Sequence, residues 1–214
     1  MQCKSDRFTC RFRVILFLAV LISPALALDP PDSTINPVSG VIEISDSVLQ
    51  SGNYNIRHTM NPGDGGSWIV TMLSAHASDD LGARIANASN GDTFVAWWRD
   101  GATDEVWFRH RDQATSIWGD ETRVSDAGTD SRNPEIRNDG ATTWVAFEAD
   151  DGLGGTEVSV RAIWEDVDPV TILGNTSITG DIDIRMHLES GHFWVTWVDD
   201  DCDVVWREYD GTAG

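Results

Sequence analysis

Acidic side chains recur at a regular spacing in this sequence. Asp100, Asp150 and Asp200 stand fifty residues apart, and each one closes a short aromatic run. Further acids gather around the last two, in the run 199–203 and at Asp151. Carboxylate oxygens beside glycine-rich backbone are ligands that Ca²⁺ takes in proteins, and they can also hydrogen-bond the hydroxyl groups of a sugar. The same residue types are common in ordinary turns and at soluble strand edges.

The best calcium candidate is an acidic run with four carboxylates: Asp199, Asp200, Asp201 and Asp203. A second candidate is the run 150–152, which ends in glycine. Neither run has the spacing of an EF-hand loop, so a role in turns is the competing interpretation. The five histidines share no metal-ligand spacing, and the sequence contains no phosphate-binding loop and no dinucleotide-binding fingerprint. Apart from calcium, the sequence therefore predicts no cofactor.

The sequence also contains a tryptophan suited to stacking on a sugar ring. Trp97 and Trp98 are neighbours on a predicted strand, so their side chains point to opposite faces of the sheet. Trp97 recurs as an aromatic residue in every repeat, which indicates a core position, whereas Trp98 has no aromatic counterpart. We therefore expect Trp98 on the surface. The expected ligand-binding residues are Trp98, Asp100, Asp150, Asp151 and Asp200.

No group of residues specifies a catalytic reaction. A pair of carboxylates can act as acid and base in a glycosidase. With 35 acidic residues in the chain, however, some pair will always fall at a workable separation. No Gly-x-Ser-x-Gly nucleophile motif is present. Three arginines end equivalent predicted strands, and we interpret them as structural residues paired with acids on a neighbouring strand or blade: Arg109, Arg161 and Arg207.

These residues are positioned by a sequence repeat with a period of fifty residues. Three aromatic runs define it, at 94–97, 144–147 and 194–197. Other short apolar or β-branched segments flank each run, separated by Gly, Asn and Asp, which is typical of half-buried antiparallel strands. Each unit is predicted to contain four strands. The first lie at 84–86, 134–137 and 184–186, the third at 105–109, 157–161 and 203–207, and the fourth at 122–125 and 170–173.

The phase of the repeat predicts how the units are arranged. Ser74 stands ten residues before Arg84, as Ser125 stands ten residues before Glu135. Residues 68–74 are therefore predicted to be a fourth strand without three strands before it, and the last unit ends after its third strand. Four-stranded units of about fifty residues are typical of β-propeller blades. The sequence thus predicts an all-β, β-propeller-type fold with four-stranded antiparallel blades, in an incomplete ring of about three blades.

Propellers contain about four to eight blades, so three blades do not close a ring. There are three explanations: the sequence is a fragment of a longer protein, which we favour; or copies assemble, for example two copies in a six-bladed ring; or residues 41–60 add further structure. Residues 28–66 are expected to form a linker and an N-terminal β segment, with a hairpin pattern at 41–60. The blades are expected at 67–214, in units at 67–80 with 81–130, 131–180 and 181–214.

The N-terminal residues 1–27 have the pattern of a secretory signal peptide. Four basic residues flank or precede an apolar run at 14–21, and Ala25-Leu26-Ala27 fits a cleavage site. The apolar run is too short to cross a bilayer, although an uncleaved anchor is the competing interpretation. Cleavage removes four basic residues and one acidic residue, which changes the net charge from −20 to −23. Such a surface repels nucleic acids and anionic membranes, so we expect neither as a partner. The signal peptide predicts a secreted, cell-surface or periplasmic protein.

The stretch from Ser125 to Asp150 resembles a blade of the sialidase-like propeller superfamily, whose repeats are called Asp-box or BNR repeats. It contains Asn133-Pro134-Glu135-Ile136 and, at 143–147, Thr-Trp-Val-Ala-Phe. The resemblance extends over about residues 68–210. It implies a propeller fold and, for true sialidases, hydrolysis of glycosides.

Three departures argue against the sialidase activity that the resemblance implies. The Asp-box is degenerate at 112–118, and Arg84-Ile85-Ala86 lacks the proline of the family's Arg-Ile-Pro motif. After cleavage the only tyrosines are Tyr54 and Tyr209, and neither lies in the setting of a sialidase nucleophile. We therefore expect a non-catalytic secreted module that binds a carbohydrate or protein ligand outside the cell. The alternative is a glycoside hydrolase of sialidase-like type, with much of its active site outside this sequence.

Overall fold

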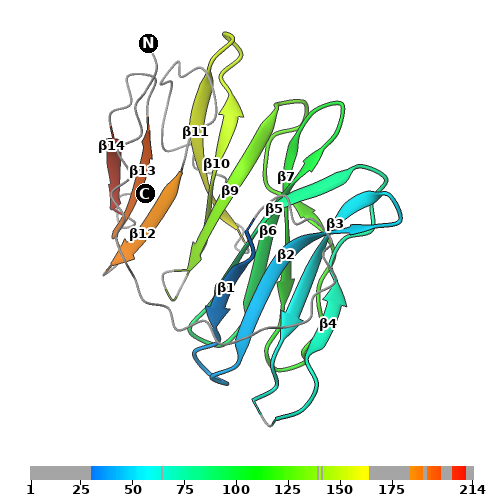
Figure 1. Cartoon of the computed structure of the whole chain (residues 1–214). Coiled ribbons are helices and arrows are strands. Elements are labelled where there is room, and N and C mark those ends of the chain that lie inside the picture. Colours follow the sequence, from blue (N-terminus) through cyan, green and yellow to red (C-terminus); the bar gives the residue numbers. More distant parts are fainter. Residues whose placement is uncertain are drawn as a thin grey trace, which may run out of the picture.

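The computed structural model describes residues 30–63, 65–138, 140, 142–163, 184–189, 192–198 and 204–210. These residues form four antiparallel sheets that fan out from a common centre (Figure 1). The predicted all-β, propeller-type fold is therefore confirmed. The predicted signal peptide (1–27) lies outside the described residues. Within the described part of the chain, no helix has the length and apolar character needed to cross a membrane.

Each sheet is built from strands that are consecutive in the sequence. The first sheet contains β1 (Asp32–Ile35), β2 (Ile42–Gln50), β3 (Asn53–Met60) and β4 (Ile69–Met72), and the second contains β5 (Asp79–Asn87), β6 (Thr93–Asp100), β7 (Glu105–Arg111) and β8 (Thr122–Arg123). The third contains β9 (Ser131–Asn138), β10 (Thr143–Asp150) and β11 (Thr156–Ile163), and the fourth contains β12 (Arg185–Glu189), β13 (His192–Val198) and β14 (Val204–Asp210). The first strands are neighbours at the centre, because β1 contacts β5, β5 contacts β9 and β9 contacts β12.

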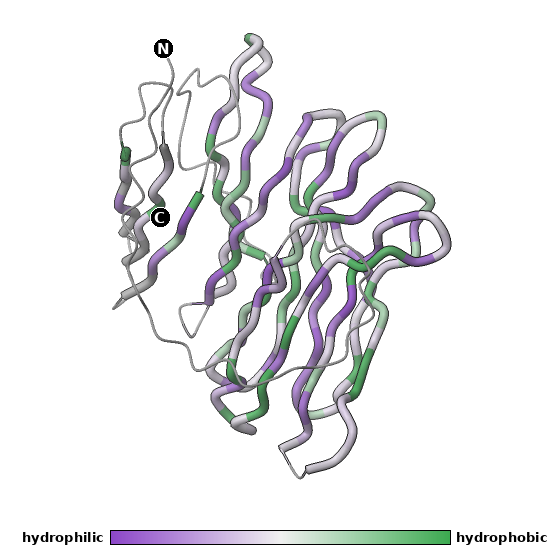
Figure 2. Tube along the Cα trace, viewed as in Figure 1, coloured by the Kyte–Doolittle hydropathy of each residue, from purple (hydrophilic) through white to green (hydrophobic). Residues whose placement is uncertain are grey.

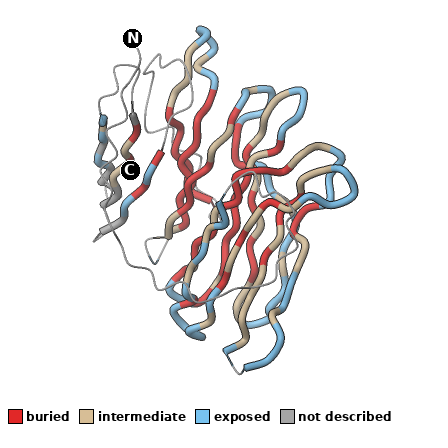
Figure 3. The backbone as a smooth tube through the Cα atoms, viewed as in Figure 1, coloured by how far each residue is buried: buried red, intermediate tan, exposed pale blue. Residues whose placement is uncertain are grey.

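Hydrophobic side chains fill the space between successive sheets. Trp97 lies in the cluster between the first and second sheets, Phe147 in the next cluster, and Trp197 in the cluster between the third and fourth sheets. All three are at most 1% exposed, as expected from the repeated aromatic runs. Rings of this size bury a large apolar area, which stabilises the stacking of the sheets. Figure 3 shows that burial is concentrated along the middle of the strands, while the turns are exposed.

Two serine hydroxyls confirm the phase of the repeat. Oγ of Ser74 accepts a hydrogen bond from the backbone N–H of Ile56 (2.8 Å), and Oγ of Ser125 accepts one from the N–H of Val106 (3.0 Å). In both sheets the serine follows the fourth strand and bonds to the third strand. Ser74 and Ser125 are therefore equivalent positions of successive sheets.

The first sheet corrects the predicted number of strands. The strand at 69–72 is not alone, because β3 pairs with it and residues 32–60 supply the other three strands. The described residues therefore form four sheets rather than about three. The segment 28–40, expected to be a linker, contains β1, and the hairpin predicted at 41–60 is confirmed as β2 and β3. The fourth strand predicted at 170–173 lies outside the described residues.

Two equivalent arginines each form a hydrogen bond from one sheet to the sheet before it. Nη1 of Arg109 on β7 donates to the carbonyl oxygen of Leu73 (2.7 Å), and Nη1 of Arg161 on β11 donates to that of Val124 (2.9 Å). The predicted structural role is confirmed for both, although the shared partner is a backbone carbonyl of the preceding sheet. The side chain of Arg207 lies outside the described residues.

Candidate functional site

One strand position carries a charged side chain in all four sheets. Its members lie opposite equivalent residues of the second strands: Asp32 opposite Ser45, Arg84 opposite Ala96, Glu135 opposite Ala146 and Arg185 opposite Thr196. Because the first strands are neighbours at the centre of the fan, charges of alternating sign follow one another around the axis. Arg137 stands two residues after Glu135 and therefore shares its face of β9. The name axial cluster is used below for Asp32, Arg84, Glu135, Arg137 and Arg185.

A β-bulge precedes two of these side chains. The pairing of β5 with β6 shifts just before Arg84, and the pairing of β9 with β10 shifts just before Glu135. Each bulge contains a residue with positive φ, Gly82 (64°) in β5 and Asn133 (51°) in β9. A bulge bends the strand and changes the direction of the side chains that follow it. The repeated bulge therefore sets the direction of Arg84 and of Glu135.

Direct contacts between sheets hold the axial cluster together. Oδ2 of Asp32 accepts a hydrogen bond from the backbone N–H of Ile85 (3.0 Å), which joins β1 to β5. Nε of Arg84 lies 3.6 Å from Oε2 of Glu135, which joins β5 to β9. The guanidinium of Arg137 contacts the other carboxylate oxygen of Glu135. Each arginine of the cluster also donates Nη1 to the carbonyl of the residue before it, so its guanidinium has a fixed direction.

Glu135 is the most buried carboxyl group of the axial cluster. Burial raises the pKa of Glu135 and the negative charge of Asp32 adds to this effect, while Arg137, Arg84 and Arg185 offset it only in part. A carboxyl group with a raised pKa keeps its proton at a pH where ordinary carboxyl groups are ionised. Glu135 can therefore donate a hydrogen bond or a proton as well as accept one.

The acidic loops that the sequence singled out meet at one end of the sheets. The loop after β6 touches the link between β8 and β9, because the backbone N–H of Asp104 donates to Oδ1 of Asp130 (2.9 Å). Burial raises the pKa of Asp104, and the charges of Asp100 and Asp130 contribute to the shift. The loop after the second strand and the link to the next sheet therefore lie on one face of this pair of sheets.

The predicted ligand-binding acids lie at these loops and not in the axial cluster. Asp100 and Asp150 end β6 and β10 and are exposed. Oδ1 of Asp150 accepts a hydrogen bond from the N–H of Gly152 (2.7 Å), and Oδ1 of Asp151 accepts one from the N–H of Leu153 (2.7 Å). Such bonds are typical of aspartates that form turns. Asp200 lies outside the described residues, and ligand binding by the other three aspartates stays a prediction.

The structure tests the prediction of a calcium site only within the described residues. Among the described residues, no group of three or more His, Cys, Asp or Glu side chains is arranged to hold a metal ion. The candidate ligands Asp199, Asp200, Asp201 and Asp203 lie outside the described residues. Calcium binding by that run therefore stays a prediction.

The side chain of Trp98 is partly buried. Its ring packs against the hydrophobic cluster between the second and third sheets and lies over the bulge at Gly82. A Cβ atom on Gly82 would lie 2.9 Å from Cδ1 of Trp98. Gly82 precedes Arg84 by two residues, so the indole borders the axial cluster. Sugar binding by Trp98 stays a prediction.

The contact between Gly82 and Trp98 leads to a prediction about stability. Gly82→Ala is expected to lower the free energy of unfolding by about 1–3 kcal/mol, because alanine strains a backbone with positive φ and its methyl group displaces the indole. Urea unfolding measures the loss. Gly128→Ala is the matched control, since Gly128 has φ +78° but nothing within 4 Å of its Cβ position. Equal losses in the two variants would show that the contact with Trp98 contributes nothing.

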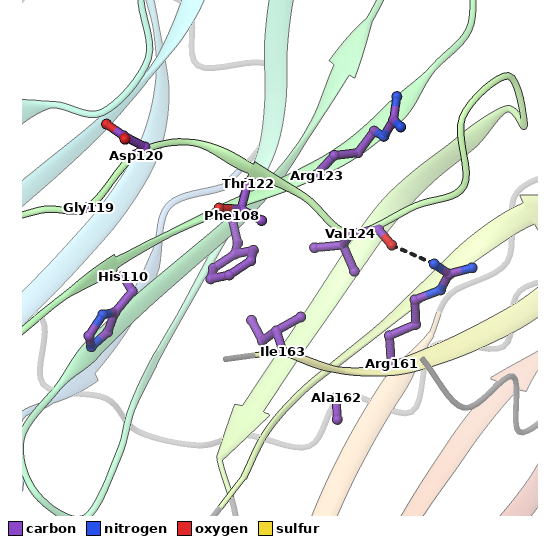
Figure 4. Close-up of a pocket in the computed structure, with 10 residues that line it drawn as sticks. All are labelled: Phe108, His110, Gly119, Asp120, Thr122, Arg123, Val124, Arg161, Ala162 and Ile163. Carbon is purple, nitrogen blue, oxygen red and sulfur yellow. Dashed lines mark hydrogen bonds between the residues drawn. The ribbon is translucent and has the colours of Figure 1, made fainter. Parts of the chain in front are cut away.

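A pocket of about 410 Å³ lies between the outer strands of the second and third sheets (Figure 4). Phe108, Val124 and Ile163 point toward one another in it, whereas Asp120 and Arg123 point away from these side chains. Arg161 stands at its edge and bonds to the carbonyl of Val124. The described lining residues aim few polar atoms inward, so the pocket does not match a polyhydroxylated ligand.

Only one member of the axial cluster, Arg84, had drawn attention in the sequence, because of its likeness to a family motif. The signal for two others was present. Arg84, Glu135 and Arg185 recur at intervals of 51 and 50 residues, each in a predicted first strand. Asp32 carried no such signal, because its sheet lacks the aromatic run that marks the repeat.

Comparison with known proteins supports the fold. No protein-family model and no curated protein matches the sequence. The structure is similar to Trypanosoma rangeli sialidase in complex with the inhibitor DANA, with a TM-score of 0.55 and 10% identity over 83% of this chain and 36% of that chain. It is also similar to an endo-arabinase from Bacteroides thetaiotaomicron, with a TM-score of 0.55 and 12% identity over 86% of this chain and 75% of that chain.

A third similar structure is a thermostable family-43 glycoside hydrolase, with a TM-score of 0.53 and 11% identity over 86% of this chain and 69% of that chain. At such identities the similarity shows the fold alone. The expected resemblance to sialidase-like β-propellers is confirmed at this level. The chain spans little more than a third of the length of the sialidase.

Proposed function

We propose that this chain is the glycan-binding part of a secreted β-propeller and that the axial cluster contacts the sugar. The observation that carries the proposal is the charged position shared by the four first strands, at Asp32, Arg84, Glu135 and Arg185. Charges taken out of water are costly, and apolar residues of similar volume often stabilise a fold as well or better. Glu135 is buried and Asp32 and Arg84 are partly buried, while Arg185 is exposed, so the charge at the first three positions indicates a role beyond packing.

The chemistry of the axial cluster suits a sugar. Hydroxyl groups both donate and accept hydrogen bonds; Asp32 and Glu135 supply acceptors, and the three guanidinium groups supply donors. An arginine fork also fits a carboxylate substituent on a sugar ring. Trp98 at the border of the cluster offers a surface on which a ring can stack. The structural neighbours named a sialidase, an endo-arabinase and a glycoside hydrolase are carbohydrate-acting proteins, which supports this ligand class.

The sequence supports a place for this function outside the cell. Residues 1–27 have the pattern of a signal peptide, and the remaining chain has a net charge of −23 after loss of four basic residues and one acidic residue from a total of −20. Such a charge opposes binding to nucleic acids and to anionic membranes. We therefore propose a neutral or weakly charged glycan, or a glycosylated protein, as the extracellular ligand.

A second candidate function is glycoside hydrolysis, and one observation favours it. Burial raises the pKa of Glu135, and a carboxyl group that keeps its proton can act as a general acid toward a glycosidic oxygen. Asp32 would be the second carboxylate. In this alternative, further catalytic groups come from outside the sequence.

A binding screen tests the proposal and separates the two functions. Labelled protein lacking residues 1–27 is applied to a glycan array and, in parallel, to a panel of chromogenic glycosides. Binding without release of chromophore is expected. Arg84→Gln and Arg185→Gln are expected to weaken binding to the best glycan about tenfold or more, because each removes a charged donor worth about 1.5–3 kcal/mol.

The matched control is Arg123→Gln. Arg123 lies on β8, the outermost strand of the second sheet and remote from the axis; it pairs with Glu105 of β7, and its side chain is 39% exposed. This variant is expected to bind like the parent protein. Equal binding by all four proteins, or an array without any bound glycan, would contradict the proposal. Chromophore release that depends on Glu135 would favour the hydrolase.

A further inference from the structure

No described residue packs on the outer face of either end sheet. Among the described residues, large hydrophobic side chains that are exposed gather mainly on the first sheet and its turns: Ile35, Val38, Ile42, Leu49, Ile69 and Val70. Figure 2 shows hydrophobic stretches along β2 and β4 of this sheet. Since Glu43, Ser45 and Ser47 are buried against the second sheet, the alternate residues of β2 face the other way. We define the outer face of the first sheet by Ile35, Ile42, Ile44, Val70 and Met72.

The uncovered face of the fourth sheet carries a tryptophan at an interior position. Trp206 pairs with Thr196 as Phe108 pairs with Ala96 and as Val160 pairs with Ala146. Phe108 and Val160 are 7% and 0% exposed, whereas Trp206 is 61% exposed. Val204 is exposed on the same strand, although Val106 and Val158 are buried at the equivalent position of the second and third sheets. The fourth sheet therefore presents a core-type surface to solvent.

The two uncovered faces are of opposite kinds. A sheet has one face toward the sheet before it in the sequence, its preceding side, and one face toward the sheet after it, its following side. In each of the three hydrophobic clusters, the following side of one sheet packs on the preceding side of the next. In the described part of the chain, no sheet packs on the face of the first sheet that points away from the second, or on the face of the fourth sheet that points away from the third. An interface that joins two such faces is heterologous, and it yields a closed ring when the rotation between copies closes.

The centre of the first sheet's outer face differs from the internal contacts in a way that fits Trp206. Asp46 pairs with Arg57 where the second sheet pairs Trp97 with Trp107, so an ion pair replaces two large rings. The opposing face is larger than its counterparts, because Trp206 replaces Phe108 and Val160. An indole can also lie over a guanidinium, which favours contact with Arg57. The smaller side chains at the centre of the first sheet's outer face therefore complement the larger Trp206 on the fourth sheet.

We propose that the outer face of the first sheet docks the fourth sheet of a second copy of this chain, and that two copies close a ring through two identical contacts. Four sheets from each copy make eight, which lies within the about four to eight blades of known propellers. The six-bladed ring considered from the sequence is replaced by this arrangement, since each chain supplies a fourth sheet. The inference does not depend on the proposed glycan ligand.

Sedimentation of the protein without residues 1–27 tests the proposal. A species of twice the chain mass is expected, and it is expected to strengthen as the salt concentration rises from about 0.15 M to about 1 M, because screening reduces repulsion between two acidic copies. Trp206→Glu and Val70→Glu each alter one face, yet each is expected to give monomers, because one altered face damages both contacts of a closed pair. Leu153→Glu, at an exposed loop, is the matched control and is expected to remain dimeric.

A mixing experiment tests the head-to-tail geometry. The Trp206→Glu variant retains the face of its first sheet and the Val70→Glu variant retains the face of its fourth sheet. A mixture of the two is expected to form an open pair through one intact contact, while each variant alone stays monomeric. A monomeric parent protein at both salt concentrations would overturn the proposal. A dimer that survives Trp206→Glu would overturn it too, because that dimer would use another surface.

Discussion

Glu43→Ala is expected to lower the free energy of unfolding by about 3–5 kcal/mol, because it leaves a buried arginine and a buried histidine without their carboxylate. Glu43 is 0% exposed and lies between the first and second sheets. Its Oε1 accepts a hydrogen bond from Nη2 of Arg111 (2.7 Å), and its Oε2 lies 2.9 Å from Nε2 of His58. Asn36 and Thr93 donate to the same carboxylate, so every neighbour loses a partner in the variant.

Urea unfolding measures this loss, and a surface ion pair supplies the comparison. Glu105 pairs with Arg123 at 2.8 Å, a distance close to that of Glu43 and Arg111, but on the exposed outer edge of the second sheet. Glu105→Ala is expected to cost about 1 kcal/mol or less, because water and side-chain freedom replace most of the interaction. If the two variants lose equal stability, burial does not increase the contribution of the Glu43 contacts to the free energy of unfolding.

The same carboxylate makes stability depend on acid. Burial alone would raise the pKa of Glu43, but the hydrogen bond with His58 and the charge of Arg111 outweigh it and lower the pKa. A carboxyl group with a lowered pKa stabilises the fold at a pH above its value in the unfolded chain, about 4.3, and this contribution is lost as the pH falls through the folded value. The stability gap between the parent protein and Glu43→Gln is therefore expected to narrow below about pH 4.

This network also explains why the sequence concealed the first sheet. The repeat can be recognised in the sequence where the second strand of a sheet buries an aromatic residue against the next sheet, as at Phe94 and Trp144. In the first sheet the equivalent position is Glu43, and the neighbouring interior positions are serines. Polar residues at interior positions erase the apolar alternation on which strand prediction rests. The buried charge of Glu43 is tolerated here because the side chains of Arg111 and Thr93 on the second sheet donate hydrogen bonds to its carboxylate.

The axial cluster was concealed for a different reason. Charged residues such as Glu135 and Arg185 lie in short first strands. The sequence of these strands does not indicate that they lie at the centre of the fan of sheets. Only the order of the sheets brings them together, since Asp32 and Arg185 are separated by about 150 residues. The local pattern therefore predicted the strands, the turn-forming acids and the buried rings, but a site made of one residue from each sheet required the three-dimensional arrangement.

Glu135→Gln is expected to stabilise the protein at neutral pH. It is also expected to weaken glycan binding about tenfold or more, because an amide nitrogen that only donates replaces a carboxyl oxygen that can accept from a sugar hydroxyl. Burial raises the pKa of Glu135, which means that the fold favours its protonated form. For such a group the stabilising contribution is complete below the unfolded pKa of about 4.3 and is lost as the pH rises through the folded value. Glutamine resembles the protonated form at every pH, so the variant is expected to gain most stability near pH 7.

The arginines around Glu135 do not cancel this gain. The side chains of Arg84 and Arg137 are 24% and 40% exposed, so water can solvate their charges when the carboxylate is removed. Glu148→Gln is the matched control, because Glu148 is buried in the same sheet but contacts Arg132 and Asn133 at the bulge rather than the axis. That variant is expected to lose stability and to keep glycan binding. Thermal melts at about pH 4 and pH 7, with titration of the best glycan, measure both quantities. Loss of stability with unchanged affinity in Glu135→Gln would make Glu135 a structural residue, and the axial cluster would lose its central member.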